Sequence, residues 1–483
     1  MKGHCKIEVF KDNKLQKIIE KDNQITDAIN QVLNSPFYNY FECNNTTKIN
    51  PLTTYSPIYT NLIGGLFMFN SIRDENPNRD TMVTPQDLNS YIGSCGGPFT
   101  GTTDKIKGSL NQNESGVVFD SNNKANGYRY VWDFGTGKSF NFRSLSLTSL
   151  NAANAGLSWD NVNDTTTKGE VFGKYNQKLD GNANSLSVRN SNNLTNVPNI
   201  ASSEGDICYI SDDFKILIVG TLANNSYTLT KYNFRDSIKL TDNFGATTGV
   251  MSDYQNWEKD LIYSITPTSA ILVATHRIIW EGDYIYSISP SWNNTTKILT
   301  INYVKINANT MEIELEHIFT IDSLTQFSAS NFTYVICGNK LLLNDGDYDK
   351  LYIINLDTYT LENTMSYTTL NSNVMNIIKF NNDIVALMMT GSASSYMYMI
   401  DLVNMKMYLQ KLSGTNFSNI DGIHQKCLKR IGNSPIFVGK SSDGVDYLNV
   451  NLFEGFIASI LNLDEDIAKA EDETLKITYT ITN

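Results

Sequence analysis

Charge, cysteine and histidine are scarce in this sequence, and their scarcity argues against several classes of protein. Charged residues make up 18% of the 483 residues, with 38 basic against 50 acidic side chains and a net charge of −12. Nucleic-acid-binding proteins present clustered lysine and arginine, so this acidic chain with dispersed basic residues predicts no nucleic-acid partner. The six cysteines are scattered without a CxxC pair, a pattern typical of reduced, buried thiols in a protein made in a cytoplasm.

Long apolar runs and metal-ligand spacings are also missing. No apolar stretch approaches the ~18–20 residues of a membrane span, and residues 1–8 have neither the apolar stretch nor the cleavage site of a secretory signal. We therefore expect no membrane insertion. The four histidines are far apart and lack the HxxxH or HxH spacing of a zinc site, so we predict no metal and no cofactor. There is no GxSxG nucleophile motif, while a Ser/His/Asp set assembled by folding stays open.

Amide, hydroxyl and aromatic side chains supply what charge does not. Asparagine alone accounts for about 59 residues, roughly 12% of the chain, and tyrosine (26) and phenylalanine (22) are frequent. Aromatic and β-branched residues favour strands, and asparagine favours the turns between them. The composition therefore predicts a mostly β protein.

Alternating apolar residues near both ends of the chain predict two strands. Ile7 and Val9 alternate with charged residues, and the segment 475–481 repeats the pattern at the other end. Because an unpaired strand edge invites aggregation, we expect both strands to join one sheet. The prediction is one module formed by both chain ends, with the middle of the chain inserted between them. The alternative is a terminal strand that pairs with a neighbouring subunit.

One segment carries the spacing of an amphipathic helix. Between residues 22 and 34 the apolar residues recur at helical intervals, namely Ile25, Ala28, Ile29, Val32 and Leu33. Asp22 or Asn23 would accept hydrogen bonds from the first free backbone N–H groups. We predict one short helix there, packed on a sheet.

Changes in composition divide the chain into five segments. Residues 1–60 hold the predicted strand and helix, and residues 61–175 form a β-rich domain with short apolar runs. Residues 176–204 are asparagine-rich and are interpreted as a linker. Residues 205–455 are dense in strands, and residues 456–483 complete the terminal module with its closing strand.

Residues 205–455 contain a weak internal repeat. In each unit a strand of alternating aromatic and apolar residues ends near one of four positions, Ile306, Leu356, Leu402 and Leu452, at spacings of about 50, 46 and 50 residues. A polar turn follows and leads into a return strand. This period matches a four-stranded propeller blade, and about 250 residues would make five or six blades. Stacked antiparallel sheets without ring closure are the alternative.

Two short motifs look like ligand-binding loops but depart from their patterns. Residues 135–139 (Gly-Thr-Gly-Lys-Ser) end like a phosphate-binding loop, yet the required earlier glycine is Trp132 and the flanks predict strands. Residues 344–349 cluster three aspartates, but no glutamate stands where a Ca²⁺ loop closes. We predict ordinary turns at both places.

Aromatic residues give the best candidates for ligand contact. The candidates gather in one stretch of the repeat region and are Trp257, Trp280, Tyr284, Trp292 and Asn293. Aromatic rings stack on sugar rings and an amide matches sugar hydroxyls, so the set suits a glycan. The alternative is that these rings pack within and between blades.

A series of short segments carries a resemblance to a known family. They read GHCKIEV at 3–9, NQITDA at 23–28, GGLFMF at 64–69, GSLNQNES at 108–115, YVWDFGT at 130–136, SLSLT at 144–148, ASILNL at 458–463 and TLKITYTIT at 474–482. In this order they resemble structural proteins of the neck, collar or tail of bacteriophages that infect Gram-positive bacteria. The repeat region lies outside the resemblance, which also weakens after residue 136, where relatives often read Ala-Asn-Gly and this chain reads Gly-Lys-Ser.

The resemblance implies a non-enzymatic virion structural protein without catalytic residues. The module of the two chain ends would anchor it to other virion proteins, and the propeller would project outward. Because virions are symmetric, such a protein is expected to act as a homo-oligomer, in a ring or a trimer. It would be made in the cytoplasm of the bacterial host and end in the virion.

Two further functions stay open for the propeller. It could be a tail-tip adhesin that binds host cell-surface carbohydrate through the aromatic residues named above. It could instead be a hydrolase that cleaves surface polysaccharide with two carboxylates about 5–10 Å apart. The carboxylates available in the repeat region include Glu281, Asp283, Asp345 and Asp347.

Overall fold

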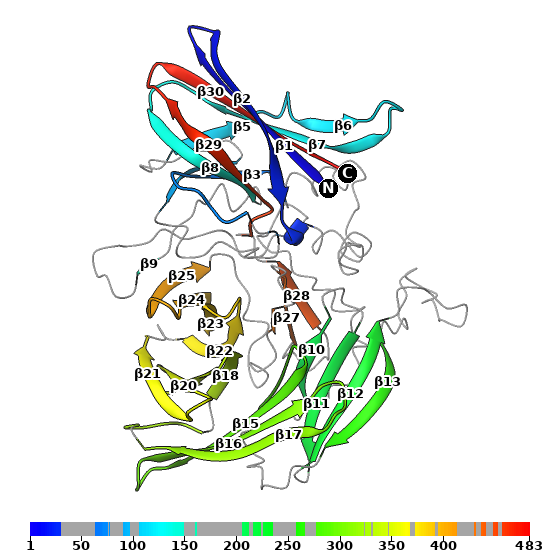
Figure 1. The fold of residues 1–483 in the computed structure, drawn as a ribbon, viewed down its shortest axis with the longest axis vertical. Helices are drawn as coiled ribbons and strands as arrows, with labels where there is room; N and C mark the ends of the chain where they lie inside the picture. Colours follow the sequence, from blue (N-terminus) through cyan, green and yellow to red (C-terminus); the bar gives the residue numbers. More distant parts are fainter. Residues whose placement is uncertain are drawn as a thin grey trace.

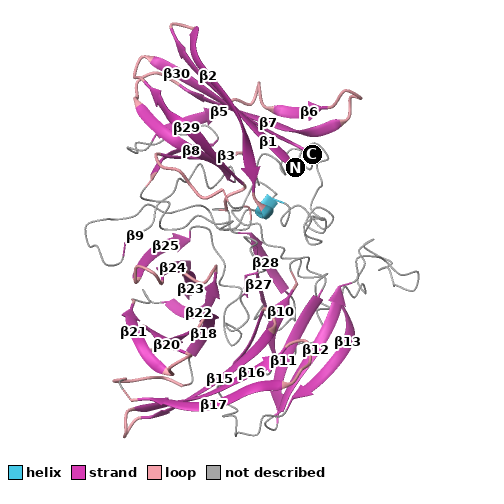
Figure 2. Cartoon of the chain, in the orientation of Figure 1, coloured by secondary structure: helices cyan, strands magenta, loops and turns pink. Residues whose placement is uncertain are grey.

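The chain folds almost entirely into strands (Figure 2). The computed structural model describes residues 1–29, 63–75, 77, 90–96, 106–148, 160–161, 205–211, 216–223, 226–234, 257–265, 277–322, 324–329, 332–345, 347–367, 372–391, 395–412, 429–430, 436–440, 448–452 and 456–483. The structural statements below concern these residues. Within them the strands form a barrel at one end of the molecule and a group of smaller sheets at the other (Figure 1).

Nine strands close into the barrel, and a tenth strand extends it. Around the ring the order is β30-β1-β2-β29-β8-β3-β4-β5-β7, and β7 pairs with β30 to close it. Neighbours are antiparallel except β4 and β5, and β6 is added beside β7. The strands are β1 (Lys2–Lys11), β2 (Lys14–Ile25), β3 (Gly65–Phe69), β4 (Tyr91–Gly96), β5 (Ile106–Leu110), β6 (Gly116–Phe119), β7 (Ala125–Phe134), β8 (Phe140–Thr148), β29 (Ser459–Lys469) and β30 (Glu473–Thr482).

The two chain ends pair directly with each other. β1 and β30 are antiparallel in unbroken register from Lys2↔Thr482 to Lys11↔Glu473, and both termini lie together in Figure 1. The predicted pairing of the chain ends in one sheet is confirmed. Strands β3 to β8, which come from the segment 61–175, belong to the same sheet.

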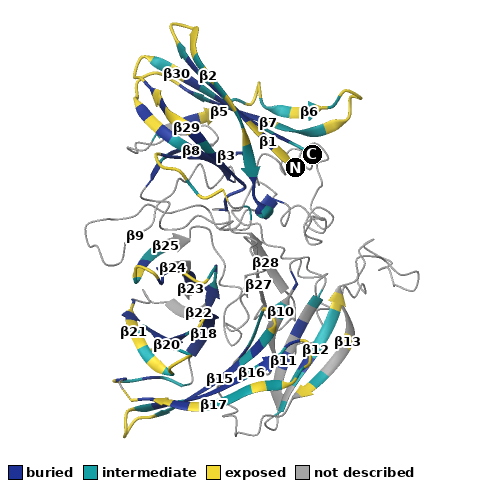
Figure 3. Cartoon of the chain, in the orientation of Figure 1, coloured by how far each residue is buried: buried dark blue, intermediate teal, exposed yellow. Residues whose placement is uncertain are grey.

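Alternation along the strands fills the barrel interior. Ile7, Ile477 and Trp132 are cross-strand neighbours on β1, β30 and β7, and all three are buried. Their neighbours along each strand face outward and are half-buried or exposed in many places (Figure 3). Successive side chains of a strand point to opposite faces, so one apolar residue in two suffices to build this core.

The predicted helix begins later than the sequence spacing indicated. Residues through Ile25 continue β2, in which Asn23 pairs with Gly3 of β1, so a helix start at Asp22 or Asn23 is wrong. The described helical residues are 27–29 (Figure 2). Cross-strand pairing with β1 overrides the local helical spacing up to Ile25. Ile25, Ala28 and Ile29 nonetheless pack in the barrel core; residues 30–34 lie outside the described part.

Five smaller sheets follow one another in chain order between the two parts of the barrel. Each is an antiparallel meander of consecutive strands. The strands are β10 (Gly205–Ile210), β11 (Ile216–Ala223), β12 (Ser226–Phe234) and β13 (Trp257–Ile265); β14 (Arg277–Glu281), β15 (Tyr284–Asn293), β16 (Ile298–Asn307) and β17 (Ile313–Ile321); β18 (Phe332–Cys337), β19 (Lys340–Asp345), β20 (Lys350–Asn355) and β21 (Thr360–Ser366); β22 (Ser372–Lys379), β23 (Ile384–Gly391), β24 (Ser395–Asp401) and β25 (Lys406–Leu412), with β9 (Asp160–Asn161) added beside β25; and β26 (Lys429–Arg430), β27 (Ile436–Lys440) and β28 (Leu448–Leu452).

These sheets have the arrangement of propeller blades. The first strand of a sheet contacts the first strand of the next sheet in three cases, β10 with β14, β18 with β22 and β22 with β26. In Figure 1 the five sheets follow one another in a ring. The predicted fold class is confirmed: a mostly β chain, with a propeller-like repeat domain inserted in a β-rich module of both chain ends and one short helix. The predicted linker 176–204 lies outside the described residues.

The sequence repeat corresponds to one recurring turn. All four repeat positions lie at or directly after the third strand of a sheet, the strands β16, β20, β24 and β28. Asn307, Asn355 and Asp401 end three of these strands, and each side chain accepts hydrogen bonds from the backbone N–H groups two and three residues later, at 2.8–3.1 Å. Amide and carboxylate side chains favour such turns because they replace a backbone acceptor.

A backbone bond joins each of these turns to the preceding turn of the same blade. The N–H group of the residue after the cap donates to the carbonyl of the turn between the first and second strands. The bonds are Ala308 to Asp283 at 2.8 Å, Leu356 to Asn339 at 2.7 Å and Leu402 to Asp383 at 2.8 Å. The repeat is therefore a structural unit that fixes one end of three of the blades.

Candidate functional site

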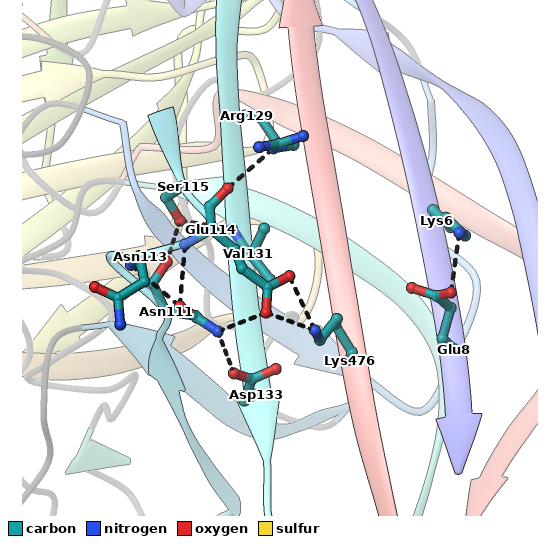
Figure 4. Close-up of polar contacts among 10 residues, drawn as sticks. All are labelled: Lys6, Glu8, Asn111, Asn113, Glu114, Ser115, Arg129, Val131, Asp133 and Lys476. Atoms are coloured by element: carbon teal, nitrogen blue, oxygen red, sulfur yellow. Dashed lines mark hydrogen bonds and ion pairs between the residues drawn. The ribbon is translucent and has the colours of Figure 1, made fainter. Parts of the chain in front are cut away.

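The connection between β5 and β6 forms a compact polar turn on the outside of the barrel (Figure 4). The Asn111 side-chain oxygen accepts from the backbone N–H groups of Asn113 and Glu114, each at 3.1 Å. The backbone N–H of Ser115 donates to the Asn111 carbonyl at 3.0 Å. Asparagine favours this geometry because its side chain bonds the backbone two and three residues ahead.

Glu114 extends from this turn across β7 to β30. Both of its carboxylate oxygens accept hydrogen bonds from Nζ of Lys476, at 2.8 and 2.9 Å. Asn111 donates to Glu114 at 3.1 Å and to Asp133 at 2.7 Å, so one amide joins two carboxylates. The hydrogen bond from Lys476 lowers the pKa of Glu114, and the same bond raises the pKa of Lys476.

Further bonds attach the turn to β7 itself. Ser115 Oγ donates to the Asn111 carbonyl at 2.7 Å and accepts from the Val131 N–H at 2.9 Å. Arg129 Nε donates to the Glu114 carbonyl at 3.0 Å. We refer to Asn111, Glu114, Ser115, Arg129, Asp133 and Lys476 as the Glu114 network. It fixes the point at which β6 leaves the barrel, because β5 ends and β6 begins on either side of this turn.

The Glu114 network continues a row of alternating charges on the outer barrel face. Asp133, Lys476 and Glu8 are direct cross-strand neighbours on β7, β30 and β1. Lys6 forms an ion pair with Glu8 at 2.9 Å (Figure 4). Opposite charges side by side on a sheet stabilise strand pairing. This face can hold the strands in register and can present charge to a partner. The Lys476 ammonium group is already bonded to the Glu114 carboxylate.

The propeller-like domain contains a second charged contact. Glu281 ends β14 and Lys379 ends β22, and their side chains form an ion pair between two sheets that are not consecutive. Cys337 ends β18, the first strand of the sheet between them. Burial raises the pKa of the Cys337 thiol to about 12, with Lys379 opposing this and Glu281 and Asp383 adding to it. A thiol with so high a pKa is a poor nucleophile at neutral pH.

In the aspartate-rich segment 344–349 the Asp345 carboxylate binds backbone N–H groups. The buried Asp345 accepts from the N–H groups of Ser328 at 3.0 Å and Asp347 at 3.2 Å. Burial raises its pKa to about 6, although these backbone bonds act in the opposite direction. The neighbouring Asn344 accepts from the Tyr367 hydroxyl at 2.5 Å. Within the described residues no group of three or more His, Cys, Asp or Glu side chains is arranged to hold a metal ion.

The four carboxylates considered for a hydrolase fall into two groups on different sheets, Glu281 with Asp283 and Asp345 with Asp347. Glu281 is paired with Lys379 at the end of β14, and Asp345 ends β19 of the next sheet. Asp283 lies in the turn that accepts the Ala308 N–H, while the Asp347 backbone binds Asp345. Nothing in the sequence predicts which carboxylates from different blades would form a catalytic pair.

The glycan candidates are distributed over both faces of one sheet and a second sheet. Trp280 is opposite Ile285 and Glu281 is opposite Tyr284, so Trp280 and Tyr284 point to opposite faces. The Trp280 indole N–H donates to the Gly282 carbonyl at 3.0 Å, and its ring packs on Tyr209 with ring centroids 5.2 Å apart.

The other candidates lie further along the strands. Nζ of Lys305 is 3.5 Å from the centroid of the Tyr284 ring. Trp292 and Asn293 are at the far end of β15, about 27–30 Å from Tyr284 at the rise of a strand. The Asn293 side chain accepts from the N–H groups of Thr295 and Thr296. Trp257 begins β13 of another sheet, and its side chain lies outside the described part. Glycan binding stays a prediction for single residues of this set.

The Gly-Thr-Gly-Lys-Ser motif is a turn between β7 and β8, as predicted. Gly137 adopts a positive φ of 97°, and its N–H donates to the Glu471 carbonyl at 2.8 Å. Nζ of Lys469 donates to the Lys138 carbonyl at 2.8 Å. The motif therefore joins the two turns at this end of the barrel.

No described helix has the length and apolar character that crossing a membrane requires.

Sequence reasoning missed the Glu114 network entirely. Its turn carries a recognisable signal, an asparagine followed three residues later by glutamate and then serine. The partners Arg129, Asp133 and Lys476 come from β7 and β30, and only the register of these strands brings them together.

Comparisons with known proteins place the chain in no established family. No protein-family model matches the sequence, and no curated protein is similar to it. Among solved structures, one that shows some similarity is a glutaminyl cyclase from Myxococcus xanthus. That similarity has 10% sequence identity and a TM-score of 0.28, and it covers 50% of this chain and 87% of the cyclase.

Proposed function

We propose that this protein is a non-enzymatic structural component of a bacteriophage virion, an appendage of the neck, collar or tail. The barrel would attach the protein to the particle, and the propeller would project from it. Its partners would be other virion proteins and further copies of itself, and its location would be the virion after synthesis in the cytoplasm of the bacterial host.

One observation carries this proposal. The segments that resemble virion proteins are scattered over the chain, yet they become strands of one barrel. Residues 3–9 lie in β1, 64–69 include β3, 144–148 end β8, 458–463 begin β29 and 474–482 lie in β30. In the barrel, β1 pairs with β30, and β29 pairs with β8, which in turn pairs with β3. The repeat region, outside the resemblance, forms the separate set of sheets.

The connections of the barrel suit it to serve as the attachment module. The inserted sheets connect to the barrel through β8 and β29, which pair with each other, and β29 leads directly into the closing strand β30. The inserted sheets can vary without interrupting the closing strands. This is the arrangement expected of a fixed base with an exchangeable outer part.

Co-purification of the protein with intact bacteriophage particles tests this proposal. Bacteriophage particles purified by density gradient and probed with an antibody against the propeller should carry the protein in the particle band. Its presence only in the soluble lysate would overturn the proposal.

A reducing-sugar assay on host cell-wall carbohydrate tests the alternative function, a polysaccharide hydrolase. Sugar release by the purified protein would support the hydrolase, and we expect no release.

A further inference from the structure

The strand β6 has one edge that no other described strand covers. It pairs with β7 from Gly116↔Arg129 to Phe119↔Ala125, while the rest of the barrel closes through β5, β7 and β30. The side chains of Val117 and Phe119 are 49% and 57% exposed. In Figure 1 the hairpin of β6 and β7 extends away from the barrel. Open edges with apolar side chains recruit another strand unless they are protected.

The backbone groups on this free edge can be identified from the ladder. The Asp120 N–H donates to the Lys124 carbonyl, so the backbone of Asp120 faces β7. In an antiparallel strand the backbone groups of successive residues point alternately to either side. Gly116 and Val118 therefore face β7, and the N–H and C=O groups of Val117 and Phe119 point to the open edge. The two residues that can bond a new strand are the two with exposed apolar side chains.

The sequence of β6 fits a second copy of itself. If two copies pair antiparallel about Val118, Val117 of one copy is opposite Phe119 of the other, and the reverse holds by symmetry. Both are then hydrogen-bonded pairs, and their four apolar side chains share one face. That face continues through Tyr128, the cross-strand neighbour of Val117, to the side of the sheet that forms the barrel core. Cross-strand pairs of aromatic and β-branched residues are among the stabilising ones.

Charge complements the same register on the opposite face. Gly116 would stand opposite Asp120 of the second copy, and Gly116 is already opposite Arg129 of its own sheet. A side-chain atom built on Gly116 would meet nothing within 4 Å. One oxygen of the Asp120 carboxylate accepts from the N–H groups of Asn122 and Lys124 in its own turn. The other oxygen can lie over Gly116 of the opposite copy and approach the exposed Arg129 guanidinium. The two-fold axis repeats this contact.

We propose that β6 joins two copies of this chain into a two-fold dimer by antiparallel strand pairing centred on Val118. The Glu114 network holds β6 in place for this, because it fixes the turn from which β6 emerges. A two-fold contact uses the same surface on both copies and closes without forming a filament. The proposal does not depend on attachment to a virion.

A single cysteine tests the register directly. In this pairing Val118 is opposite Val118 of the second copy in a non-hydrogen-bonded pair, with Cα atoms about 4.5 Å apart, within disulfide reach. The full-length Val118→Cys variant should form a disulfide-linked dimer under mild oxidation. Asn122→Cys, in the exposed turn of the same hairpin, is the matched control and should stay largely monomeric. The unchanged chain reports any contribution of the native cysteines.

Sedimentation equilibrium supplies the second measurement. Over roughly 1–100 μM, a range in which weak dimers associate, the unchanged chain should show a concentration-dependent dimer. Val117→Lys with Phe119→Lys should abolish it while far-ultraviolet circular dichroism and the unfolding midpoint stay close to those of the unchanged chain. The proposal is overturned if Val118→Cys crosslinks no faster than Asn122→Cys, or if a folded double-lysine variant still dimerises as the unchanged chain does.

Discussion

Glu114 and Lys476 bond through both carboxylate oxygens, at 2.8 and 2.9 Å, although 362 residues separate them in the sequence. Lys476 belongs to the strand that closes the barrel, and Glu114 belongs to the turn that precedes β6. The contact therefore links the closure of the barrel by the chain ends to the position of β6.

Removing the Glu114 carboxylate should weaken the barrel modestly. Glu114→Gln is expected to cost about 0.5–1 kcal/mol of unfolding free energy at low salt and less at high salt, because the pair is half exposed. The lowered pKa of Glu114 means that its contribution is present above the pKa of an unfolded glutamate and is lost as pH falls through the folded pKa. Urea unfolding at two salt concentrations measures this, with Glu312→Gln in the propeller as the control. Equal losses in both variants would contradict a specific role.

Closure between β7 and β30 should be sensitive to a single methyl group. A Cβ atom on Gly127 would overlap the Ile481 carbonyl oxygen, whereas one on Gly135 would meet nothing within 4 Å. Gly127→Ala must shift the backbone of one strand, and overpacking of this kind costs about 1–3 kcal/mol. Gly135→Ala should remain within about 0.5 kcal/mol of the unchanged chain. Thermal and urea unfolding compare the two; an unchanged Gly127→Ala protein would show that these strands do not pair as described.

Buried Asp345 should make the propeller more stable at mildly acidic pH. Its folded pKa of about 6 is above that of an unfolded aspartate, so the folded state binds the proton more tightly. As pH falls from 7 to 5, this group should add about 1–1.5 kcal/mol to the unfolding free energy, and more as pH approaches 4. Asp345→Asn should remove this rise. The difference between the two urea-unfolding profiles across pH 4–8 measures it, and parallel profiles would rule out the ionisation of Asp345 as its cause.

The recurring blade turn should depend on its capping side chain. Asn307→Ala loses the bonds to the N–H groups of Asn309 and Thr310 and the bond to Glu314. A loss of about 1 kcal/mol is expected, as for other side-chain caps of backbone groups. Asn309→Ala changes the same turn without removing a cap and should be nearly neutral. If both variants unfold alike, the side-chain cap does not stabilise the repeat.

The sequence predicted those features that depend on local alternation and on repetition. Ile7, Val9 and the 475–481 segment alternate strictly, and they form paired strands with a buried face. The repeat in the sequence predicted the blade turns for a similar reason, since Asn355 and Asp401 occupy the same place in successive blades. Strand and turn signals within a few residues were sufficient for both.

Features that depend on register were not predictable from the sequence. The segment from residue 22 has helical spacing, but pairing of Asn23 with Gly3 extends β2 through Ile25. The aromatic candidates are close in sequence, yet strand pairing directs Trp280 and Tyr284 to opposite faces. The Glu114 network joins residues from three distant segments, and no local pattern marks Lys476 as its partner.

Epitope labelling of intact particles tests the proposed attachment most directly. One epitope would be inserted in the propeller turn beside Val403, which is 67% exposed, and another in the β1–β2 turn at residues 12–13 of the barrel. We expect immunogold to label the Val403 epitope at the neck, collar or tail, and the barrel epitope only after the particles are dissociated. Particles that lack the protein, or that expose the barrel epitope while hiding the one at Val403, would contradict attachment through the barrel.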